Sequence, residues 1–142
     1  MTKLNRNGSG LVFSTYLGGL DTDTGMRIAL DHSGEVYVAG LAGDGFPTTA
    51  GAFQTAFGSA ADDNPETRLD GFVAKLNDSG SALVYSTYLG GSGEEQGLGI
   101  ALDADGNAYV TQFTGLDHDD GYDRDHDYDH GGDHHGDDDG KW

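Results

Sequence analysis

The sequence predicts an all-β fold built from a duplicated unit of short antiparallel strands, and three observations support this prediction. A long segment recurs without a gap at a constant offset, which aligns Lys3 with Lys75. Within it, bulky residues alternate with the period of two that is typical of strands. No amphipathic helical pattern of useful length is present, and the 25 glycines indicate many tight turns or a flexible segment.

The repeat is visible along most of the chain. Its two occurrences share residue types at strand and turn positions alike, and chance does not produce an ungapped match of this length. We therefore interpret the chain as the product of a duplication. The matching segments are Lys3–Asn5 with Lys75–Asn77, Leu11–Gly19 with Leu83–Gly91, Ile28–Asp31 with Ile100–Asp103, and Tyr37-Val38 with Tyr109-Val110.

Each complete repeat is expected to contain four short strands. In the second repeat these lie near residues 71–76, 83–89, 99–102 and 108–111. The strand at 83–89 carries bulky groups on both faces, which indicates that neighbouring layers cover both. Asp103–Gly106 is a tight-turn sequence in which glycine supplies a positive φ. Four short antiparallel strands are the content of one β-propeller blade.

The predicted architecture is therefore two propeller-blade-like four-stranded antiparallel units, the first incomplete, followed by a low-complexity acidic tail. The first blade-like repeat spans residues 1–43 and a connector loop spans 44–69. The second repeat spans 70–116, and the Asp/His/Gly-rich tail spans 117–142.

These residues resemble the bacterial seven-bladed β-propeller repeat family, often abbreviated SBBP. The resemblance covers roughly residues 3 to 114. It implies an extracellular or cell-surface location, a repeat architecture and no shared catalytic residues, although Met1–Asn5 opens no signal peptide. The segments that carry the resemblance are Asp70–Asn77, Leu83–Gly91, Ile100–Val110 and the connector Phe46–Gln54.

The chain departs from the family pattern in ways that predict self-association. Closed propellers contain about four to eight blades, whereas this chain carries two repeats, and the first lacks the strand segment that would precede Lys3. Isolated blades leave apolar faces and strand edges open. We expect a structural, self-assembling homo-oligomer or filament subunit. The alternatives are a propeller-type module that binds a glycan or protein, and a fragment of a larger surface propeller protein.

Composition limits the remaining function classes. The formal net charge of −18 argues against nucleic acid and anionic membranes as partners and favours divalent cations and basic proteins. Without cysteine, no disulfide or thiolate site can form, and no apolar run is long enough to span a bilayer. No Ser–His constellation or convergent set of carboxylates appears outside the tail, so no enzyme activity is expected.

The tail carries the one candidate metal site. Residues 117–142 contain 11 Asp and 5 His and almost no aliphatic residue, which predicts disorder in isolation. In an extended chain alternating carboxylates line one side, where they suit Ca²⁺, and the imidazoles suit Zn²⁺, Ni²⁺ or Cu²⁺. The alternative is a solvated tail that serves solubility. The candidate ligands are Asp123, Asp125, Asp127, Asp129, His130, His134 and His135.

A second acidic segment, Asp103–Asn107, has the oxygen ligands of a short Ca²⁺ loop. The equivalent segment of the first repeat, Asp31–Glu35, keeps only one of its two aspartates and lacks the asparagine. A turn explains both segments, so we expect a turn at each place.

Overall fold

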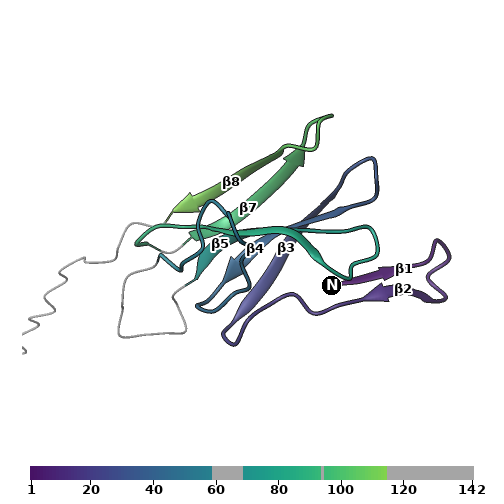
Figure 1. Cartoon of the computed structure of the whole chain (residues 1–142), viewed down its shortest axis with the longest axis horizontal. Coiled ribbons are helices and arrows are strands. Elements are labelled where there is room, and N and C mark those ends of the chain that lie inside the picture. Colours follow the sequence, from purple (N-terminus) through teal and green to yellow (C-terminus); the bar gives the residue numbers. More distant parts are fainter. Residues whose placement is uncertain (59–68, 94, 115–142) are drawn as a thin grey trace, which may run out of the picture.

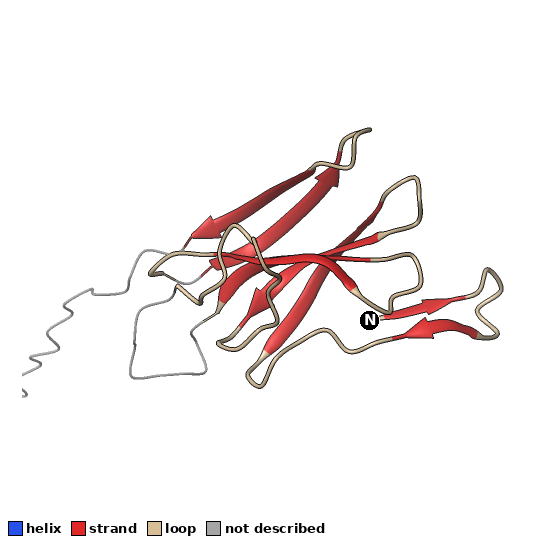
Figure 2. Cartoon of the chain, in the orientation of Figure 1, coloured by secondary structure: helices blue, strands red, loops and turns tan. Residues whose placement is uncertain are grey.

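The computed structural model describes residues 1–58, 69–93 and 95–114, and every regular element within these ranges is a β-strand (Figures 1 and 2). The all-β class expected from the sequence is therefore confirmed. No helix in the described ranges is long and apolar enough to cross a membrane. The strands are β1 (Thr2–Leu4), β2 (Leu11–Ser14), β3 (Asp23–Leu30), β4 (Val36–Ala42), β5 (Asp70–Leu76), β6 (Leu83–Leu89), β7 (Glu95–Leu102) and β8 (Ala108–Thr114).

The strands form three antiparallel sheets. A central sheet has the order β3-β4-β5-β6, and two hairpins, β1–β2 and β7–β8, form separate two-stranded sheets. We call β1–β2 the first hairpin and β7–β8 the last hairpin. Figure 1 shows them on different sides of the central sheet. The described residues thus form a stack of layers and not a closed propeller.

The pairing of the strands differs from the prediction that each repeat makes its own four-stranded unit. The central sheet takes β3 and β4 from the first repeat and β5 and β6 from the second. The last two strands of the second repeat, β7 and β8, leave β6 and pair with each other in the next layer. The four-stranded sheet is therefore shifted by half a repeat relative to the repeat boundaries.

The connector explains why β7 does not pair with β6. The backbone N–H of Thr49 donates to the carbonyl of Ser86 over 3.0 Å, and the N–H of Ser86 donates to the Thr49 hydroxyl over 3.0 Å. Further along the connector, the N–H of Tyr88 donates to the carbonyl of Gln54 over 3.0 Å. These contacts satisfy the outer edge of β6, so that edge is not open to another strand.

Strands β4 and β5 of the central sheet are buried on both faces, whereas most residues of β3 are exposed. One face carries a cluster of Val36, Val38, Ala42, Phe46, Phe72, Ala74, Leu76 and Tyr88, against which Met1, Phe13 and Leu17 pack from the first hairpin and the segment after it. The other face carries Ala39 and Val73, which pack against Ile100 and Val110 of the last hairpin. The expectation that both faces of the strand at 83–89 are covered holds at Ser86, Thr87 and Tyr88, whereas Val84 near the start of the strand is 49% exposed.

The tight turns follow one design in both repeats. The Asp31 carboxylate accepts from the N–H groups of Ser33 and Glu35, each over 3.0 Å. The Asp103 carboxylate accepts in the same way from the N–H groups two and four residues later. Gly34 and Gly106, with φ of 85° and 82°, close these turns in a conformation that favours glycine. The expected turn role of both segments is confirmed.

Candidate functional site

The first and last hairpins each contain two strands. The strands at the equivalent positions of the other repeat pair with one another in the central sheet. At the offset that aligns Lys3 with Lys75, β1 and β2 correspond to β5 and β6, while β7 corresponds to β3 and β8 to β4. The central sheet therefore shows how a last hairpin and a first hairpin fit together. Within the described residues, neither hairpin has such a partner.

The absence of a partner sheet leaves large side chains in water. Several residues that are buried in β4, β5 and β6 have exposed equivalents in and beside the hairpins, although the local sequence is similar. The exposed fractions are 55% for Leu4 against 3% for Leu76, 103% for Tyr16 against 2% for Tyr88, and 64% for Tyr109 against 0% for Tyr37. The hairpins thus present core-type surface without a covering layer.

A lysine joins β5 to the turn before β4 in the central sheet. The Nζ atom of Lys75 lies 2.6 Å from a Glu35 carboxylate oxygen and 3.3 Å from Asp31 Oδ2. It also lies over the Tyr37 ring, 4.8 Å from the centroid. The Glu35 contact is the main reason that the pKa of Lys75 is raised above its usual value. The pKa of Asp31 is lowered, chiefly by the hydrogen bond from the Ser33 hydroxyl.

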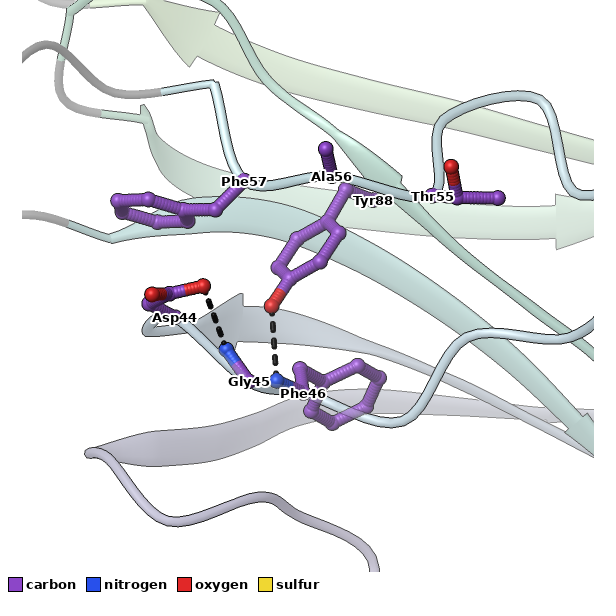
Figure 3. Close-up of a pocket in the computed structure, with 7 residues that line it drawn as sticks. All are labelled: Asp44, Gly45, Phe46, Thr55, Ala56, Phe57 and Tyr88. Atoms are coloured by element: carbon purple, nitrogen blue, oxygen red, sulfur yellow. Dashed lines mark hydrogen bonds between the residues drawn. The ribbon is translucent and has the colours of Figure 1, made fainter.

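The clearest concavity near the connector is a pocket of about 400 Å³ (Figure 3). The Tyr88 hydroxyl lies in it, where it accepts from the N–H of Phe46 and donates to the carbonyl of Gly43, both over 2.8 Å. Burial raises the pKa of Tyr88 above its usual value. Both hydrogen bonds hold the connector on the sheet, so this hydroxyl is engaged in structure. The pocket is lined by Asp44, Gly45, Phe46, Thr55, Ala56, Phe57 and Tyr88.

Carboxylates that are buried or partly buried lie at the beginnings of three strands. Asp70, at the start of β5, accepts from the N–H of Gly58 over 2.7 Å and from the Gln54 amide over 3.3 Å. Glu95, at the start of β7, accepts from the N–H of Gly91 over 3.1 Å, but its other oxygen has no hydrogen-bond partner. Burial is the main cause that raises the pKa of Glu95.

The first repeat contains the counterpart of the Glu95 contact. Asp23, the equivalent of Glu95, accepts from the N–H of Gly19 over 2.6 Å, and its second oxygen is also buried without a partner. Sequence reasoning missed this pair of carboxylates. The signal that could have found it is an acidic residue four positions after the second glycine of Gly18-Gly19 and Gly90-Gly91.

The metal ligands predicted from the sequence lie outside the described residues. This holds for Asp123, Asp125, Asp127, Asp129, His130, His134 and His135. In the described ranges, no group of three or more His, Cys, Asp or Glu side chains is placed to hold a metal ion. The Asp103 carboxylate, the other candidate, accepts hydrogen bonds from its own turn, including one of 2.8 Å from the Asn107 amide.

Comparison with known proteins gives no relative: no family model, no curated protein and no solved structure matches the chain.

Proposed function

We propose that this chain is a structural subunit that associates with further copies of itself through its first and last hairpins, and that it catalyses no reaction. The observation that carries the proposal is the contrast in exposure between the hairpins and the central sheet. In repeat folds each unit buries its faces against the next unit. Hairpins that lack this cover offer their faces and strand edges to another chain.

The exposed surface is large enough to drive association. Burying a large apolar side chain contributes about 1.5–3 kcal/mol, whereas association costs about 4–15 kcal/mol of lost freedom. Burial of several hairpin side chains is therefore sufficient to offset the cost. Those available on the two hairpins are Leu4, Leu11, Val12, Ile100, Tyr109 and Phe113, of which all but Ile100 are largely exposed.

Electrostatic repulsion opposes this association. The net charge of −18 is shared by every copy, and like charges on two chains raise the free energy of the assembly. Cations that gather at the tail carboxylates would reduce the repulsion, and this is the form in which we propose assistance by calcium. The proposed location, extracellular or at the cell surface, rests on the resemblance of the repeat alone.

A binding module for a glycan or protein is the second candidate function. The pocket of Figure 3 favours it, because an aromatic ring, Phe57, and a carboxylate, Asp44, line the same concavity. Aromatic faces and a few polar groups are typical of small-ligand sites. Binding to an immobilised glycan panel that Asp44→Ala abolishes, in a protein that stays monomeric, would favour this function over assembly.

Sedimentation velocity over a series of protein concentrations tests the assembly function. We expect species larger than the 14.9 kDa chain at micromolar concentration. Their fraction should increase from about 0.1 M to about 1 M NaCl, as the Debye length falls from about 10 Å to about 3 Å. A monodisperse monomer at every concentration and salt level would contradict the proposal. An increase with CaCl₂ beyond that of NaCl at equal ionic strength would support assistance by calcium.

A further inference from the structure

We propose that β8 of one chain pairs antiparallel with β1 of a second chain, so that the last and first hairpins of two chains complete a four-stranded sheet of order β7-β8-β1-β2. This inference rests on the proposed self-assembly and names the surface through which it occurs. The template is the central sheet, in which the equivalent strands already pair in the order β3-β4-β5-β6. Both edges that would meet, that of β8 and that of β1, are unpaired within the described residues.

The central sheet also supplies the register of the new pairing. There, β4 pairs with β5 without interruption from Val36 opposite Leu76 to Ala42 opposite Asp70. Replacing each residue of β4 and β5 by its equivalent in the other repeat places β8 beside β1. The resulting Cα partners are Ala108 with Leu4, Tyr109 with Lys3, Val110 with Thr2, and Thr111 with Met1.

The charges at this junction are complementary. Lys3 is the equivalent of Lys75, and on its own chain it is exposed, with Nζ 5.9 Å from the centroid of the Phe13 ring. In the paired sheet it would lie beside Asp103 and over the ring of Tyr109. These two residues are the equivalents of the carboxylate and the tyrosine that Lys75 contacts. Asn107 replaces the second carboxylate, so Lys3 would have one ion-pair partner where Lys75 has two.

The apolar surfaces also match. On the face that the last hairpin covers, Leu41 packs in one cluster with Ile100 and Val110. The equivalents of these residues are Phe113, which is 67% exposed, and Ile28 and Val38, which line a cavity of about 340 Å³. Phe113 of one chain would therefore fill the cavity of the next.

A hydrogen bond between layers is expected at the same junction. The Tyr37 hydroxyl donates to the carbonyl of Gly106 in the neighbouring layer over 2.9 Å. By the same equivalence, the exposed Tyr109 would donate its hydroxyl hydrogen to the carbonyl of Gly34 in the second chain. The junction thus repeats the contacts of the layers inside one chain.

The two surfaces that meet are different, so the contact is head-to-tail. Such heterologous contacts give a ring when the rotation closes and a filament when it does not. Each added chain contributes its own central sheet and one shared four-stranded sheet. We therefore expect either a ring with a fixed number of chains or a filament of variable length, depending on the rotation between successive chains.

Cross-linking of mixed single-cysteine variants tests the register. The chain has no cysteine, so Thr2→Cys mixed with Val110→Cys can form a mixed disulfide only between chains. Directly paired residues have Cα atoms about 4.5–5.5 Å apart, within the range for a disulfide. Thr2→Cys mixed with Gln112→Cys is the control. Gln112 lies two residues, or about 6.8 Å, further along β8 than Val110, so its Cα atom is too far from that of Thr2 for a disulfide. We expect the mixed disulfide, identified by mass spectrometry, in the first mixture and little in the second.

Sedimentation and cross-linking together distinguish the pairing of β8 with β1 from self-assembly by another surface. Larger species in sedimentation without the Thr2–Val110 disulfide, or with equal disulfide in both mixtures, would overturn the strand pairing and leave self-assembly standing. Monomers in every sample would overturn both. Larger species with the disulfide confined to the first mixture would support both.

A charge variant provides a second test that needs no cysteine. We expect Lys3→Glu to weaken association about tenfold or more, because it places two carboxylates together at the junction. Lys3→Arg should retain association. Arg6→Glu is the matched control, since Arg6 lies in the exposed turn between β1 and β2 and changes the net charge equally. Equal weakening by Lys3→Glu and Arg6→Glu would contradict the specific contact.

Discussion

The hydroxyl of Tyr37, in the central sheet, donates a hydrogen bond of 2.9 Å to the carbonyl of Gly106, in the turn of the last hairpin. Tyr37 is fully buried, so this bond joins two layers out of contact with water. Its two residues are 69 positions apart in the sequence. It therefore joins the two repeats and is not part of the backbone pairing within either sheet.

Tyr37→Phe should loosen the last hairpin while leaving the central sheet intact. Loss of one hydrogen bond costs about 1 kcal/mol, which corresponds to about a fivefold increase in local opening. Hydrogen exchange should therefore accelerate in β7 and β8 and remain unchanged in β4 and β5. Tyr109→Phe, measured on dilute protein, is the control. Uniform acceleration across all strands would show that the hydroxyl supports global stability instead.

Tyr88→Phe should destabilise the whole fold. The variant leaves the N–H of Phe46 and the carbonyl of Gly43 without their partner, and a buried unpaired group costs about 1–3 kcal/mol. Urea unfolding should show the loss as a lower midpoint with an unchanged m-value. Tyr16→Phe is the matched control, because Tyr16 occupies the equivalent position and is fully exposed. Equal losses in both variants would contradict this role of Tyr88.

Lys75→Met should lower the thermal midpoint at neutral pH. The variant removes the cation between Asp31 and Glu35. The pKa of Asp31 is lowered in the folded state chiefly by the Ser33 hydroxyl and in part by Lys75, so the part of its contribution that depends on Lys75 is complete above the unfolded pKa of about 3.9 and decreases as the pH falls below it. The pKa of Lys75 is raised, so its contribution is complete below about 10.4 and is lost at higher pH.

The difference between wild type and Lys75→Met should accordingly be largest between about pH 4 and pH 10. Thermal melts at pH 3 and pH 7, on protein dilute enough to be monomeric, would measure it, with Lys3→Met as the control at the equivalent exposed position. A difference that is the same at both pH values would indicate that Lys75 acts through the packing of its aliphatic stem.

The sequence predicts strand positions and turns well because both depend on local chemistry. Alternation places side chains on faces, and Asp31 and Asp103 form the same turn because each carboxylate reaches N–H groups two and four residues later. Strand partners depend on contacts between distant residues. The contacts of Thr49 and Gln54 with the edge of β6 have no local signature, so the half-repeat shift of the central sheet was not predictable from alternation.

For the exposed hairpin faces too, the sequence predicts one part and the structure is needed for the rest. The expectation that the chain exposes apolar strand faces comes from the resemblance of its two repeats to propeller blades. Which faces are exposed depends on the shift of the sheet, and is visible only when Leu4 is compared with Leu76 or Tyr16 with Tyr88. The contact of Glu95 with Gly91 has a sequence signal only in the acidic residue that follows the glycine pair in both repeats, and its burial needed the structure, since strand alternation does not mark an acidic residue as buried.

Glu95→Gln should stabilise the protein at neutral pH. Glu95 is 1% exposed, one of its oxygens has no partner, and the Asp70 carboxylate adds repulsion to the effect of burial, so its pKa is raised. The folded state then binds a proton more tightly than the unfolded state. Between the unfolded pKa of about 4.3 and the raised pKa, stability therefore falls as the pH rises.

Glutamine keeps the shape of the side chain and removes the charge, so the variant should melt a few degrees higher at pH 7 and lose this part of the pH dependence. Thermal melts from about pH 4 to pH 8 measure both effects. Asp78→Asn is the control, because it removes one carboxylate from an exposed turn and surface substitutions usually change stability by less than about 0.5 kcal/mol. A destabilised Glu95→Gln would mean that the charged carboxylate, through its bond to the N–H of Gly91, is what holds the beginning of β7 in place.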